Sequence, residues 1–192
     1  MSSEKRDLQS KRKGFGEAFL DGYKPAILIE RDHPNLHLLN DYPSYPFDEK
    51  LILFFQNEGL RKQYESKMEY LEKDTYEECC LLGLTLGFPQ KSVEFFARNE
   101  QIRLRTGMLS NRGVSIGMEW AGICFTTHID YVEHEARWLH PKAIENPLYL
   151  WTKETSYLEV PYGDFDQLIK TSEYIREKRG LIISKNRDIA LF

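Results

Sequence analysis

Residues 75–100 constrain the fold of this chain most, because they indicate two helices joined by almost no loop. Thr75 and Glu78 have the spacing of a capping box, which predicts that the first helix begins at this point. Gly87 is typical of the residue that ends a helix, and Pro89 suits the first position of the next one. Because the first helix is too apolar to face water, we expect it to pack in the core of a folded domain.

Beyond residue 100 the spacing of apolar residues changes from helical to alternating, on both sides of the segment Asn111-Arg112-Gly113. This alternation predicts a β-hairpin with Gly113 in the left-handed position of a three-residue loop. In that register Arg105 lies opposite Glu119 as a cross-strand ion pair.

The rest of the chain adds helices and short strands. We expect a helix over residues 48–58, and Asp164 with Gln167 is the start signal of another. Residues 148–151 and 157–160 read as short strands, and two apolar runs at 181–184 and 189–192 as a closing hairpin.

Together these elements predict an α+β fold. A helical layer over residues 48–99 and 164–179 packs on a small antiparallel sheet, centred on the hairpin over residues 102–125. Since neither an internal repeat nor a clear linker is present, we expect residues 14–192 to form a single domain. Residues 1–13 carry five basic side chains and are expected to be a flexible arm.

Composition limits the classes of partner. A net charge of −4 argues against nonspecific binding to nucleic acid or to an anionic membrane, although the basic arm leaves a nucleic-acid-associated role as an alternative. The longest apolar run is about half of what a membrane span requires. Three cysteines and no recognisable signal peptide indicate a cytoplasmic, reduced, soluble protein.

One cluster of reactive residue types stands near the middle of the chain. His128, Asp130 and His134 could supply three ligands to zinc or another divalent metal, with a position left open for water. Cys124 with His128 could form a thiolate–imidazole pair, so a metal- or thiol-dependent enzyme is one alternative. The opposing interpretation is a solvated helix start with a buried cysteine, which requires no cofactor.

Two other groups of residues suggest binding surfaces. Aromatic side chains in a proline-rich loop could contact a partner or pin the loop to the core: Tyr42, Tyr45 and Phe47. Guanidinium groups on the predicted hairpin could bind phosphate or carboxylate: Arg103, Arg105 and Arg112. Phosphate-binding loops, dinucleotide fingerprints and nucleophile elbows are absent from the sequence.

The segment Gly22-Tyr23-Lys24-Pro25-Ala26, followed later by Leu86-Gly87-Phe88-Pro89, resembles an uncharacterised bacterial family. That family is a domain of unknown function with a Gly-x-Lys-Pro-Ala segment and a later Leu-Gly-Tyr-Pro turn. The matching residues cover about a tenth of the chain and are structural in type. The resemblance implies a bacterial cytoplasmic protein and carries no information on chemistry.

The reactive side chains are scattered along the chain, whereas aromatic residues are plentiful outside the predicted helices. We therefore predict a non-enzymatic regulatory or protein-binding protein that acts on a protein partner or by self-association. The metal- or thiol-dependent enzyme and the nucleic-acid-associated protein are the alternatives.

Overall fold

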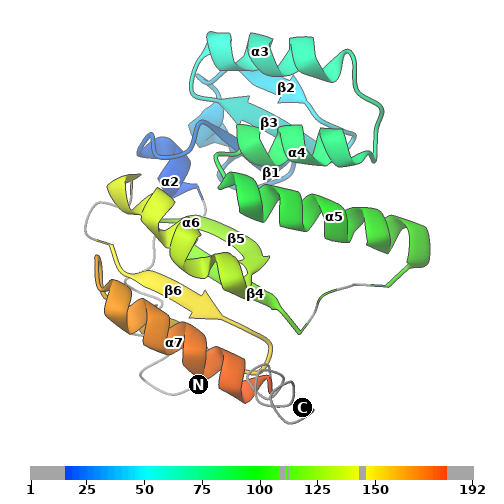
Figure 1. The fold of residues 1–192 in the computed structure, drawn as a ribbon. Coiled ribbons are helices and arrows are strands. Elements are labelled where there is room, and N and C mark those ends of the chain that lie inside the picture. Colours follow the sequence, from blue (N-terminus) through cyan, green and yellow to red (C-terminus); the bar gives the residue numbers. More distant parts are fainter. Residues whose placement is uncertain (1–15, 109–110, 112, 143–145, 181–192) are drawn as a thin grey trace.

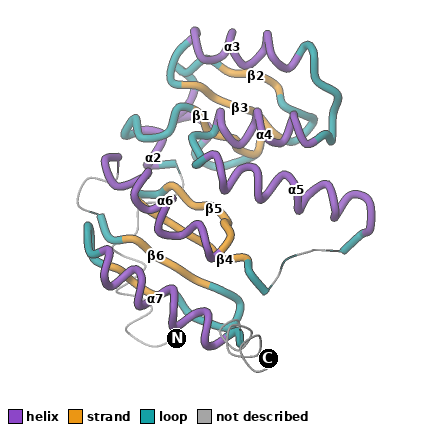
Figure 2. Tube along the Cα trace, in the orientation of Figure 1, coloured by secondary structure: helices purple, strands orange, loops and turns teal. Residues whose placement is uncertain are grey.

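The computed structural model describes residues 16–108, 111, 113–142 and 146–180. Within these residues, six α-helices and two antiparallel sheets of three and four strands form an α+β fold (Figures 1 and 2). The predicted fold class is therefore confirmed. The predicted basic arm and the predicted closing hairpin lie outside the described residues.

The first sheet comprises β1 (Ala26–Glu30), β3 (Leu51–Phe55) and β2 (Ser44–Pro46), in the order β1-β3-β2. One face packs on the short helix α2 (Glu17–Leu20) and the 3-10 helix η1 (Leu36–Leu39), through a cluster that includes Phe19, Leu39 and Phe54. The other face packs on α3 (Glu58–Met68) and α4 (Tyr76–Thr85). The central strand is thus buried on both sides.

This arrangement corrects the predicted helix over residues 48–58. The apolar run Leu51–Phe55 forms strand β3, and α3 begins only after Asn57, whose Oδ1 accepts the backbone N–H of Leu60 at 3.0 Å. A strand that is apolar on both faces has no alternation, so its hydrophobic pattern does not separate it from a buried helix.

The two consecutive helices are present as predicted: α4 and then α5 (Gln90–Thr106). Thr75 Oγ1 accepts the backbone N–H of Glu78 at 3.2 Å, so the cap is confirmed. Gly87 has a φ of 81°, and a Cβ atom on it would lie 2.6 Å from Cδ of Pro25. A glycine is therefore required there by both conformation and space.

The second sheet has the order β5-β4-β6-β7. Its strands are β4 (Ser115–Trp120), β5 (Ile123–His128), β6 (Leu148–Trp151) and β7 (Leu158–Val160). A 3-10 turn η2 (Ile129–Tyr131) leads from β5 into α6 (Val132–Leu139), and η3 (His140–Lys142) follows α6. One face of the sheet packs on α6 and on α7 (Phe165–Lys178), both visible in front of it in Figure 1. β6 and β7 fall where the sequence predicts strands.

The first strand of the hairpin predicted over residues 102–125 is wrong. Residues 102–106 form the last turns of α5, which ends at Gly107 with a φ of 70°. Because these turns are exposed, burial imposes no helical pattern on them, and the alternation there misleads. The observed hairpin joins β4 to β5 through Ala121 and Gly122, whose φ values of 50° and 81° suit a tight two-residue turn.

The predicted ion pair between Arg105 and Glu119 is wrong for the same reason. Arg105 lies on the exposed end of α5, whereas Glu119 is buried in β4 between Cys124 of β5 and Tyr149 of β6.

Candidate functional site

The pairing of β4 with its two neighbours determines which side chains share a face of the second sheet. Gly117 of β4 pairs with Thr126 of β5 and with Trp151 of β6. Directly paired residues of antiparallel strands project from the same face. This face is opposite the one that packs on α6 and α7, and it carries polar and aromatic side chains in place of an apolar core.

Two adjoining cavities lie beside this face. The first, which we call the apolar chamber, has a volume of about 420 Å³. Its walls come from α4, α5, β5 and β6 and are lined by Cys79, Leu82, Gly83, Leu86, Phe88, Ser92, Val93, Phe96, Cys124, Phe125, Thr126 and Trp151. A Cβ atom on Gly83 would lie 2.8 Å from Cγ2 of Val93, so α4 and α5 are in close contact at this wall.

The second cavity, which we call the charged groove, has a volume of about 710 Å³. It shares Phe96, Thr126 and Trp151 with the apolar chamber, so the two form one continuous feature, the α5 cleft. The charged side chains in the groove are Glu100, Lys153, Glu154 and Arg179. The cleft therefore offers an apolar interior that leads to a rim with charges of both signs.

Arg179 fixes one end of the charged groove. Its Nη1 donates to the backbone oxygens of Gly113 and Ser115 at 3.0 and 2.6 Å, and its Nε donates to Oε2 of Glu154 at 3.1 Å. The guanidinium group lowers the pKa of the Glu154 carboxyl group through this hydrogen bond. The end of α7 is thereby joined to the start of β4 and to the loop after β6.

The N-terminal part of α5 is held against η2 and α6 by aromatic contacts. Lys91 Nζ lies 5.4 Å from the ring centroid of Tyr131, and the ring of Phe95 meets that of His128 edge-on at 5.4 Å. Edge-on aromatic pairs and cation–π contacts are favourable geometries. These contacts set the position of α5 along the cleft.

A buried carboxyl group lies at the same junction. Glu135 of α6 is fully buried beside Ser92, whose hydroxyl group and backbone N–H lie at the start of α5. Burial raises the pKa of Glu135, and the contact with Ser92 opposes that shift in part. Because Pro89 provides no side-chain cap for α5, the Glu135 carboxyl group is well placed to interact with the N-terminal end of this helix.

Lys24 lies behind the wall of the apolar chamber. Its Nζ is 4.9 Å from the ring centroid of Phe88, and the side chain is almost fully buried. Loss of hydration lowers the pKa of Lys24 to about 8, and the neighbouring Cys124 acts in the opposite direction. Phe88 and Cys124 both line the chamber, so a titratable amine lies next to it.

The chamber thiol on α4 is not activated. Burial raises the pKa of Cys79 to about 11, and the neighbouring Cys80 and Glu100 act in the same direction. Since the thiolate is the nucleophilic form, Cys79 is almost entirely protonated at neutral pH.

The three residues predicted as metal ligands take part in different contacts. The backbone N–H of Asp130 donates to Nδ1 of His128 at 3.1 Å, and Oδ1 of Asp130 pairs with Nη2 of Arg176 at 2.8 Å. His134 Nδ1 instead lies 3.5 Å from Oε2 of Glu135. Among the described residues, no group of three or more His, Cys, Asp or Glu side chains is arranged to hold a metal ion.

The aromatic residues of the proline-rich loop contact the core. The ring of Tyr42 lies 4.8 Å from that of Phe19, and Tyr45 meets Tyr64 edge-on at 5.4 Å. Phe47 is half-buried, and its backbone N–H donates to the carbonyl oxygen of Leu51. The loop is thus joined to both sides of the first sheet.

The predicted arginine group is not on a hairpin. Arg103 and Arg105 project from the end of α5, where Arg103 pairs with Glu100, while Arg112 lies outside the described residues. Arg103 is thus close to the charged groove, which Glu100 lines.

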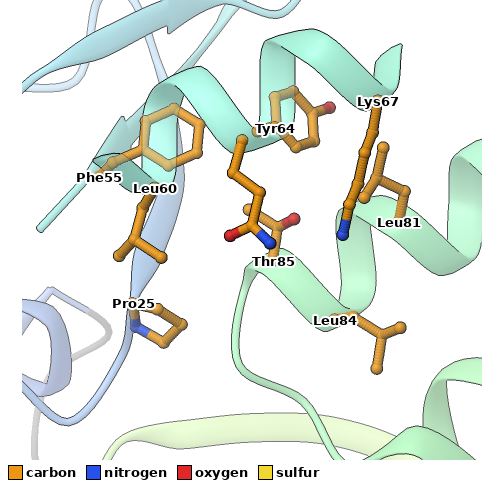
Figure 3. A pocket seen from close by; sticks show the side chains of 9 residues that line it. Pro25, Phe55, Leu60, Tyr64, Lys67, Leu81, Leu84 and Thr85 are labelled. Atoms are coloured by element: carbon orange, nitrogen blue, oxygen red, sulfur yellow. The ribbon is translucent and has the colours of Figure 1, made fainter. Parts of the chain in front are cut away.

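A smaller cavity lies between α3 and α4, with a volume of about 200 Å³ (Figure 3). Its apolar walls include Leu60, Tyr64 and Leu81, which belong to the core of the first sheet or pack against it, and Figure 3 shows Lys67 extending from α3 toward α4 beside Leu81. Because it is smaller than either part of the α5 cleft, the cleft is the stronger candidate for the functional site.

Sequence reasoning did not single out Phe96, Trp151, Arg179, Lys24 or Glu135. They come from α5, the end of β6, the end of α7, the segment before β1, and α6, and only the fold brings them together. One local signal was available: an isolated glycine within an alternating strand marks a place where another group approaches closely. Gly117 is such a residue.

No family model matches the chain, and neither a curated protein nor a solved structure shows a significant match to it. Across the described residues, no helix has both the length and the apolar character needed to cross a membrane.

Proposed function

We propose that this chain is a non-enzymatic binding protein that takes an exposed segment of a partner protein into the α5 cleft. The observation that carries the proposal is the continuity of the apolar chamber with the charged groove through Phe96, Thr126 and Trp151. A concave apolar site with a few polar groups at its edge is the usual form of a binding site.

The surroundings of the cleft favour a protein over a small molecule. Phe96 is 51% exposed, and the apolar surface continues along the outer side of α4 and α5 through Leu84, Ile102 and Leu104, all of them exposed. Exposed apolar surface bordered by charged residues is typical of protein interaction sites. Charges of both signs at the rim suit a peptide segment with mixed charges.

In this proposal an apolar side chain of the partner enters the chamber, and the adjoining part of its backbone lies along the groove. Phe96 contacts both parts of the segment because it lines both cavities. It would therefore contribute more binding energy than the charged side chains at the rim, as is usual for aromatic residues at the centre of an interface.

The test is quantitative affinity capture from the native cell lysate, with Phe96→Arg compared with Tyr70→Arg. Tyr70 is an exposed aromatic residue just beyond α3 and does not line the cleft, so it serves as a matched control. We expect a stoichiometric protein partner that is retained by the control and reduced at least tenfold by Phe96→Arg. Equal retention by both variants would contradict the proposal.

A further inference from the structure

The end of α7 delivers the chain to the rim of the α5 cleft. Arg179 lines the charged groove and is held there by Glu154 and by the backbone oxygens of Gly113 and Ser115. The next residue, Gly180, has a φ of 67° and ends the helix. The chain therefore leaves α7 at the groove.

The residues that follow have a composition that matches the cleft. Residues 181–192, which lie outside the described part of the chain, begin with an apolar run and end with Ile189-Ala190-Leu191-Phe192. Between these runs stand charged residues of both signs, including Lys185, Arg187 and Asp188. The order from charged to apolar side chains repeats the order from groove to chamber.

The distances along β4 allow the segment to reach the chamber. Arg179 contacts Ser115, and Trp151, which lines both cavities, pairs with Gly117 two residues further along the same strand. Two residues of strand correspond to about 7 Å. The eight residues from 181 to 188 span up to about 26–29 Å when extended. The second apolar run therefore has ample length to reach the chamber.

We propose that residues 181–192 fold back into the α5 cleft, with Leu191 and Phe192 in the apolar chamber, and so act as an internal competitor of the partner segment. The occupant is this segment of the same chain, because it begins at the groove and carries side chains that match both parts of the cleft. A segment attached by a short linker has an effective concentration in the millimolar range, so even weak docking is well populated.

The competitive role rests on the function proposed above, whereas the docking itself rests only on the geometry. In that role, a partner must displace the segment before it can bind. Weakening the segment should then increase capture of the partner without any change in the cleft.

The cysteines of the chain provide a direct test of docking. Cys79 and Cys124 line the apolar chamber, whereas Cys80, next to Cys79 on α4, does not. In the full chain carrying Leu191→Cys, mild oxidation with diamide at pH 8.5 followed by peptide mass spectrometry reports which native thiol the new one reaches. Disulfide exchange requires close contact between the two sulfur atoms.

We expect the thiol introduced at position 191 to link to Cys79 or Cys124 at least tenfold more often than to Cys80. Ser184→Cys is the matched control, since the same segment places it outside the chamber, and it should show no such preference. An unlinked thiol at position 191, or equal linkage to Cys80, would overturn the inference. Pairing of the two apolar runs with each other as a hairpin would give that negative result.

The two proposals can fail separately. If the thiol at position 191 links to the chamber but Phe96→Arg still captures the partner, the proposed function is wrong and the docking stands. If Phe96→Arg loses the partner but the thiol shows no preference for the chamber, the docking is wrong and the proposed function stands.

Discussion

The indole of Trp151 lies directly over the backbone of Gly117. The two residues pair across β6 and β4, and a Cβ atom on Gly117 would lie 2.0 Å from Cε2 of the indole. This contact determines the position of an aromatic wall that the apolar chamber and the charged groove share. The shape of the α5 cleft thus depends on the absence of a side chain at one strand position.

Gly117→Ala should therefore displace Trp151 and destabilise the protein. Because a bulky ring on a neighbouring strand must move, we expect the free energy of unfolding in urea to fall by about 1–3 kcal/mol. The near-ultraviolet circular dichroism should change as well. Gly113→Ala is the control, because a Cβ atom there meets nothing within 4 Å, and its stability should stay close to that of the parent chain. Equal stability of the two variants would show that the contact does not constrain Trp151.

Glu135 should make stability depend on pH. Burial raises its pKa above the ordinary value of 4.5, so the folded state is penalised once the carboxyl group must ionise. The penalty is absent below the unfolded-state pKa and grows as the pH rises through the folded-state pKa. Glu135→Gln should thus be more stable than the parent chain at pH 8, with the difference closing toward pH 4.

Urea unfolding at a series of pH values measures this difference. Glu133→Gln on the same helix is the control, since Glu133 is exposed and pairs with Arg137. A Glu135→Gln variant whose advantage does not change with pH would refute the assignment of the penalty to the buried carboxyl group.

Lys24 should give the opposite dependence on pH. Its pKa is about 8 in the folded protein compared with an ordinary value of 10.5, because burial disfavours the charged amine. The penalty is fully present below pH 8 and disappears as the pH rises to 10.5. Relative to Lys24→Met, the parent chain should gain up to about 3 kcal/mol of stability across that interval.

Chemical unfolding at several pH values between 7 and 10.5 measures this gain. Lys62→Met is a suitable control, because Lys62 is an exposed lysine on α3. If the parent chain and Lys24→Met showed the same dependence on pH, the amine would have to be well hydrated in the folded protein.

Features that depend on nearby residues could be predicted from the sequence. The cap at Thr75, the helix end at Gly87 and the cap formed by Asp164 with Gln167 all involve residues within four positions of one another. Such hydrogen bonds and backbone conformations are written into the local sequence.

Features that depend on tertiary burial could not be predicted in the same way. Leu51–Phe55 is buried on both faces and lacks alternation, whereas Ile102 and Leu104 alternate but lie on an exposed helix end. Periodicity reports structure only where one face is buried and the other is not. Both errors occur where that condition fails.

The candidate site was the least predictable part of the chain. Phe96, Trp151 and Arg179 come together only because α5, β6 and α7 meet around β4. Each is an unremarkable residue in its own segment. Gly117 alone carried a local signal of a close approach, and even that signal does not say which side chain approaches.

The most direct test of the central claim is site-specific photo-crosslinking in the native lysate. Phe96 and, as a control, Tyr70 are each replaced by p-benzoylphenylalanine, and the products are identified by mass spectrometry. The account predicts that the probe at position 96 crosslinks the same protein that affinity capture retains, while the probe at position 70 does not. Crosslinking of that protein at position 70 and not at position 96 would place the binding surface outside the α5 cleft and contradict the account.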